Sequence, residues 1–103
     1  MGLRVVLEDE QGREIESVED PANILHQVLP SPDDNTFCYL NRIDWYGDTT
    51  FNRLQIADIR QELERLIKAP STGPNAISLL ERIGEFAVRS QSEPHLYVKF
   101  YGD

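Results

Sequence analysis

The chain has 103 residues, of which 40% are hydrophobic and 27% are charged, and its formal net charge is −8. This length suits a single domain over residues 1–103, because domains commonly have about 100–150 residues. The composition excludes a disordered, collagen-like or membrane-embedded chain. The pI near 4.6 excludes direct binding to a nucleic-acid backbone, which requires clustered Lys and Arg.

The negative charge is concentrated in the first third of the chain. Residues 1–34 contain nine acidic and two basic side chains, a net charge of −7, whereas residues 35–103 contain nine and eight, a net charge of −1. Such a charged surface commonly serves solubility alone. It could also attract a basic partner and raise the rate of association.

Two strands and a short helix are predicted for this first third. Residues 3–8 alternate between apolar and polar side chains as a half-buried strand does, and the polar residues 14–18 suit a strand at the edge of a sheet. Asp20 and Pro21 form a typical helix start, in which Asp caps free N–H groups, and Pro30 ends the short helix.

The middle of the chain is predicted to form a β-hairpin followed by a long helix. Residues 36–44 are rich in aromatic and branched side chains, residues 45–48 turn the chain, and residues 49–54 return as the partner strand. The apolar residues that follow recur at helical spacing, which predicts a helix from Ile56 to Lys68.

A second long helix and a final strand are predicted after the loop at residues 69–74. The apolar stripe of this helix runs from Ala76 to Ala87 and includes Gly84, which a close helix contact would explain. Residues 94–101 alternate strictly. The resulting order, ββαββααβ, favours an α+β fold. It has one mainly antiparallel sheet of four to five strands, with two long helices and one short helix packed on it.

No feature of the sequence points to secretion or to a membrane. Cys38 is the only cysteine, which excludes an intramolecular disulfide, and its apolar surroundings predict a buried thiol. The amino terminus lacks the pattern of a signal peptide, and no apolar stretch approaches the ~20 residues of a membrane span. A cytoplasmic protein is therefore expected.

Enzyme motifs are missing from the sequence. It contains no phosphate-binding glycine loop, no nucleophile elbow and no paired-histidine or paired-cysteine metal motif. His26 and His95 are the only histidines, so a zinc site would need carboxylates to complete it. We therefore expect no catalytic residues, no metal and no cofactor.

Two tetrapeptides of the same type stand out, Trp45-Tyr46-Gly47-Asp48 and Phe100-Tyr101-Gly102-Asp103. In a structural interpretation, Gly allows a positive φ in a turn, Asp caps the backbone, and the aromatic rings close the core. In a functional interpretation, the turns that the two tetrapeptides form, here called the two corners, meet and supply acid–base groups or cation ligands. The polar cluster of this second interpretation consists of Asp44, Asp48, His95 and Asp103, with Arg42 or Arg53 nearby.

One face of the final strand carries His95, Tyr97, Lys99 and Tyr101. Tyrosines beside charges suit a protein-binding surface, because Tyr offers a large contact area and a polar tip. In the alternative interpretation, helices cover this face as well, and Tyr97 belongs to the core.

Two segments carry a resemblance to known proteins: Tyr46-Gly47-Asp48-Thr49-Thr50-Phe51-Asn52 and His95-Leu96-Tyr97-Val98-Lys99-Phe100-Tyr101-Gly102-Asp103. They resemble segments of small uncharacterised bacterial proteins of about 100 residues that end in a Phe-aromatic-Gly-Asp motif. That resemblance extends to length and layout and brings no established activity with it. In size and acidity the chain is also similar to immunity proteins that neutralise bacterial toxins.

These features favour a non-catalytic protein-binding module, such as a bacterial immunity or inhibitor protein, that engages a basic partner through its acidic first third. The residues expected at the partner-binding surface are Glu8, Asp9, Glu10, Glu14, Glu16, Tyr97, Lys99 and Tyr101. The alternative is a small enzyme or metal-dependent site built on the polar cluster of Asp44, Asp48, His95 and Asp103. The sequence defines neither the identity of the partner nor the oligomeric state.

Overall fold

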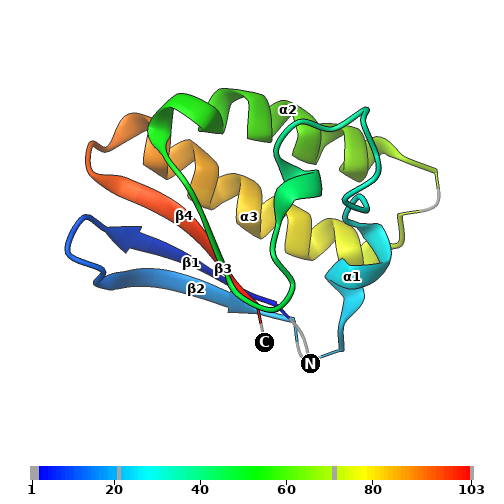
Figure 1. Cartoon of the computed structure of the whole chain (residues 1–103), viewed down its shortest axis with the longest axis horizontal. Helices are drawn as coiled ribbons and strands as arrows, with labels where there is room; N and C mark the ends of the chain where they lie inside the picture. Colours follow the sequence, from blue (N-terminus) through cyan, green and yellow to red (C-terminus); the bar gives the residue numbers. More distant parts are fainter. Residues whose placement is uncertain (1–2, 21, 71, 103) are drawn as a thin grey trace.

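A sheet and a set of helices form two layers (Figure 1). The computed structural model describes residues 3–20, 22–70 and 72–102. Within these residues, four antiparallel strands form one sheet in the order β2-β1-β4-β3. The strands are β1 (Arg4–Asp9), β2 (Glu14–Glu19), β3 (Asp48–Phe51) and β4 (Leu96–Tyr101).

The second layer contains the helices of the described ranges, which are α1 (Ile24–Val28), α2 (Arg53–Lys68) and α3 (Pro74–Ser92). Helices α2 and α3 lie side by side over one face of the sheet, and α1 packs at one end of this layer (Figure 1). The start of α2 is fixed by a capping box. The Asn52 side chain accepts from the Leu54 N–H at 3.0 Å, and the Asn52 N–H donates to the Gln55 side chain at 2.9 Å.

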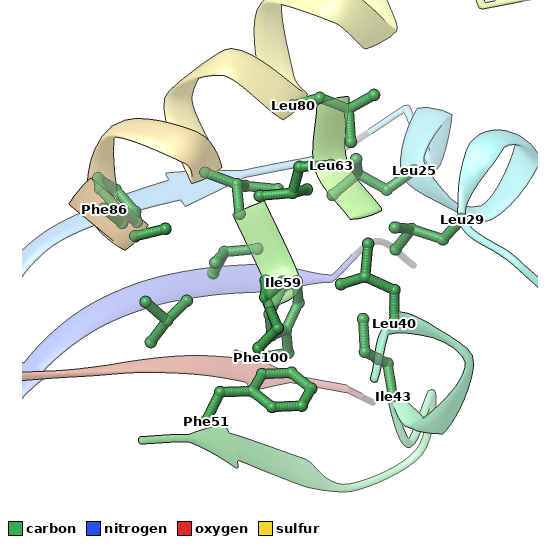
Figure 2. Packing of buried hydrophobic residues seen from close by; sticks show 14 of the residues in the cluster. Leu25, Leu29, Leu40, Ile43, Phe51, Ile59, Leu63, Leu80, Phe86 and Phe100 are labelled. Carbon is green, nitrogen blue, oxygen red and sulfur yellow. The ribbon is translucent and has the colours of Figure 1, made fainter. Parts of the chain in front are cut away.

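The core lies between the two layers. Val5 and Leu7 of β1 point toward the helices, as do the alternate residues of β4, because successive strand side chains face opposite sides. Figure 2 shows the rings of Phe51 and Phe100 at the sheet, with centroids 5.8 Å apart. The helix side chains that meet this surface include Ile59, Leu63, Leu80 and Phe86.

The predicted fold class is confirmed, since the chain forms an α+β structure with an antiparallel sheet, two long helices and one short helix. β1, β2, α1, α3 and β4 lie close to their predicted positions, and β2 is an edge strand as expected. Helix α2 begins at Arg53, three residues before the predicted Ile56, because the Asn52 cap starts it earlier.

The prediction of a strand at residues 36–44 is wrong, and so is the hairpin built on it. This segment is a loop that contains a short 3-10 helix, η1 (Leu40–Arg42). Its buried side chains, Phe37, Leu40 and Ile43, are three residues apart rather than two, so they do not alternate as strand residues would. The returning strand is β3, which pairs with β4 instead.

Two smaller expectations also fail. The Cys38 thiol is exposed, because it falls between the buried Phe37 and Leu40 in this three-residue spacing. A side chain placed at Gly84 would meet nothing within 4 Å, so no close contact explains this glycine. It therefore costs the helix about 1 kcal/mol relative to Ala without a local packing reason.

Candidate functional site

The face of the sheet that points away from the helices carries part of the set of strand residues expected to bind a partner. Helices α2 and α3 lie over the other face, so neither of these two helices covers this one (Figure 1). Arg4 lies opposite Tyr101, Val6 opposite Lys99, and Glu8 opposite Tyr97. We call this surface the open sheet face and define it by Arg4, Val6, Glu8, Tyr97, Lys99 and Tyr101. The interpretation in which helices bury Tyr97 is therefore wrong.

A hydrogen-bonded network holds the open sheet face together. The Tyr101 hydroxyl donates to the Glu8 carboxylate, and this bond, with burial, raises the pKa of Tyr101. The Lys99 ammonium lies 4.8 Å from the centre of the Tyr101 ring. The hydrogen bond with Tyr101 is the main cause of a raised Lys99 pKa, and the negative charges of Glu8 and Asp48 add to it.

The centre of this face is apolar. Val6 is 0% exposed although no helix lies over it, so the long side chains beside it, such as Lys99, must cover it. Glu8 is only 7% exposed. As a result Glu8 orients Tyr101 and Lys99 rather than presenting a free carboxylate to a partner.

The acidic residues of the hairpin β1–β2 are largely paired within the chain. Arg4 contacts Glu14, and Arg89 of α3 contacts Glu16 at 3.0 Å. Asp9 accepts from the N–H of Arg13 at 2.8 Å and so shapes the turn. The hairpin therefore presents less unpaired negative charge than its sequence alone suggests.

The eight nominated residues come from three adjacent strands and one turn, but they do not share one surface. Glu16 and Asp9 follow the alternation of the core-facing residues and lie on the helix side, whereas Glu8 lies on the open sheet face. Glu10 lies in the turn, and its side chain is 3.0 Å from the Nδ1 of His95. The acidic surface is thus divided between the two sides of the sheet.

The two aromatic-Tyr-Gly-Asp corners meet at one end of the sheet. Strands β3 and β4 pair with Asp48 opposite Tyr101, and the Gly102 N–H donates to the Gly47 carbonyl at 2.7 Å. A Cβ at Gly102 would lie 2.5 Å from the carbonyl carbon and oxygen of Trp45, so only glycine fits there. This close approach gives the second corner a structural role.

Among the described residues of the polar cluster proposed as an alternative site, Asp44, Asp48 and His95 do not come together. Asp48 lies beside the end of β4, whereas His95 precedes its beginning, roughly 20 Å away by strand geometry. Asp44 accepts from the Tyr46 N–H at 2.9 Å and so serves the turn. Asp103 lies outside the described residues, and within them no three His, Cys, Asp or Glu side chains are grouped as metal ligands would be.

Besides Glu8, two buried acids carry structural roles, and the sequence prediction found one of them. Asp20 accepts from the N–H groups of Ile24 at 2.8 Å and Leu25 at 2.6 Å, so it caps free N–H groups as predicted. The helix itself begins at Ile24, after the N-cap residue Asn23, and the predicted first helical residue, Pro21, lies outside the described residues. Glu62 of α2 accepts from the backbone N–H groups of Cys38, Tyr39 and Leu40, and this role was not predicted. Its position three residues after Ile59 and four before Leu66, on the apolar face of the helix, is the sequence feature that indicates burial.

None of the helices in the described ranges combines the length and the apolar character that crossing a bilayer requires. No protein-family model matches the chain, and searches of curated proteins and of solved structures find no similar protein.

Proposed function

We propose that this protein is a non-catalytic protein-binding module, an immunity or inhibitor protein, whose open sheet face and hairpin turn engage a basic partner. The observation that carries the proposal is the open sheet face itself. It carries two tyrosines beside the buried Val6, next to the carboxylates of the β1–β2 hairpin.

The chemistry of this surface suits a protein partner. Tyr97 and Tyr101 are half-buried, so they offer contact area with little further loss of side-chain entropy. Tyr101 is also fixed by Glu8, which lowers the cost of ordering it on binding. The face is therefore preorganised.

The carboxylates around the open sheet face favour a basic partner. Glu10 contacts an imidazole rather than a permanent cation, and Glu19 lies 3.8 Å from an Arg4 guanidinium that also serves Glu14. These carboxylates keep negative charge at the rim, where charge acts mainly on the association rate. Arg4 and Lys99, which also belong to the open sheet face, add positive charges that a partner's acidic residue could match.

The test is capture of a partner with the intact chain, followed by measurement of its association kinetics. We expect a basic protein whose association rate falls at least about tenfold between low and physiological salt. Tyr97→Ala should accelerate dissociation, and Glu10→Gln with Glu14→Gln should slow association. The matched control is Asp33→Asn with Asp58→Asn, which removes the same charge from exposed positions elsewhere.

Three results would contradict the proposal, two on charge and one on the contact surface. One is an association rate that does not depend on salt. The other is equal slowing by the control pair, which would mean that net charge alone matters. If Tyr97→Ala left dissociation unchanged, the open sheet face would not be the contact surface.

A further inference from the structure

A groove of about 720 Å³ runs between α2 and α3 on the surface that faces away from the sheet. Its apolar lining includes Ala57, Ile67, Gly84 and Val88. Val88, four residues before the end of α3, is 46% exposed, so its apolar side chain is accessible from the groove. The groove lies on the opposite layer from the open sheet face, so it is independent of the function proposed above.

Gly84 forms part of the groove at the middle of α3. Nothing lies within 4 Å of the position where its Cβ would be, so neither packing nor a turn requires glycine there. Glycine nevertheless weakens a helix interior relative to alanine. Because glycine has no side chain, the groove is deeper at this point. A side chain of a bound partner would fit there.

The charges along the groove are mainly negative. Glu64, Glu81 and Glu85 line it together with a single cation, Arg60. Arg60 is held by the Gln91 side chain at 2.6 Å. Among the residues of the described ranges, no Lys or Arg lies within 4.0 Å of Glu81 or Glu85, whereas Glu64 has Lys68 at 3.8 Å. Two carboxylates beside an apolar floor thus lack an internal cation.

We propose that this groove binds one amphipathic helix of a partner protein, with apolar residues over Gly84 and Val88 and basic residues toward Glu81 and Glu85. Two adjacent helices offer no free backbone groups to an extended strand, whereas a third helix can seat its ridge of side chains between them. A second copy of this chain would bring an equally acidic groove and a net charge of −8 against the first. A basic helix matches both the shape and the charge.

The probe for this proposal is a synthetic helical peptide with leucine along one face and lysine on the other. When it is titrated into the ¹⁵N-labelled chain, the amide shifts should change in α2 and α3 near Ala57, Gly84 and Val88. Gly84→Leu fills the groove and should weaken binding at least about tenfold. Glu81→Gln with Glu85→Gln should weaken binding and reduce its salt dependence.

Three controls separate this site from general attraction to an acidic protein. Asp33→Asn with Asp58→Asn removes the same charge outside the groove and should leave the affinity unchanged. The peptide with serine in place of leucine should not bind. If Gly84→Leu proves unfolded by circular dichroism, Val88→Ser at the exposed rim serves in its place. Shifts that map to the open sheet face, or wild-type affinity in both Gly84→Leu and Val88→Ser, would overturn the proposal.

Discussion

The carboxylate of Glu62 accepts a hydrogen bond from the backbone N–H of Leu40 at 2.9 Å, across a separation of 22 residues. The same carboxylate accepts from the N–H of Cys38 at 3.0 Å and from that of Tyr39 at 3.2 Å. One helix side chain therefore satisfies three successive backbone donors that would otherwise need a neighbouring strand. Arg65, one turn further along α2, donates to the Thr36 carbonyl at 2.6 Å and holds the beginning of the same loop.

Glu62→Gln should lower the free energy of unfolding by about 2–4 kcal/mol, because an amide cannot accept all of these bonds and leaves buried N–H groups unpaired. Urea unfolding followed by circular dichroism measures this loss. Glu85→Gln, at an exposed position of α3, is the control and should change stability by less than about 0.5 kcal/mol. Equal stability of the two variants would show that the η1 segment does not depend on Glu62.

Stability should fall above about pH 10, because the pKa values of both Tyr101 and Lys99 are raised in the folded state. A raised folded pKa contributes stability below the unfolded value, and this contribution is lost as the pH rises through the folded value. The alkaline fall in the thermal midpoint should therefore be shallower in Tyr101→Phe. Tyr46→Phe is the control, since Tyr46 is 86% exposed, and it should follow the wild-type profile.

Gly102→Ala should destabilise the protein by about 1–3 kcal/mol, because the new Cβ would overlap the Trp45 carbonyl at 2.5 Å and push β3 from β4. Thermal unfolding measures the effect. Amide exchange should increase first in β3, whose Phe51 pairs with Val98. An unchanged thermal midpoint would mean that residues 44–47 can move enough to make room for the new methyl group.

Gly84→Ala should have the opposite effect and raise the free energy of unfolding by about 0.5–1 kcal/mol, because the methyl group meets nothing and the helix gains propensity. For a domain of this size that corresponds to a rise of roughly 2–8 °C in the thermal midpoint. A lower midpoint would indicate that Gly84 has a packing role after all.

Elements with a clear apolar period could be predicted from the sequence, because burial and local geometry agree in them. In β4 the alternation of Leu96, Val98 and Phe100 matches the buried residues, and in α2 the spacing gave the helix its correct end at Lys68. The strand prediction for residues 36–44 failed because their strand propensity is overridden by a tertiary contact with Glu62. No local pattern near Phe37 indicates that contact.

The candidate site could be predicted only in part. Alternation placed Tyr97, Lys99 and Tyr101 on one face of a strand, but which face the helices cover depends on how the layers pack. The pairing of Glu16 with Arg89 joins β2 to α3, and a count of charges along the chain cannot show it. The groove between α2 and α3 likewise requires two helix surfaces to be placed together.

Strands β1 and β4 occupy the centre of the sheet, although they come from opposite ends of the chain (Figure 1). During synthesis β1 can pair with β2 at once, but its other edge has no partner until residues 96–101 have left the ribosome. The nascent chain therefore exposes an unpaired strand edge, with free backbone N–H and C=O groups, through most of its translation, a situation in which chaperones are commonly needed. Folding must wait for the last strand, and its rate will be limited by this distant pairing rather than by the helices.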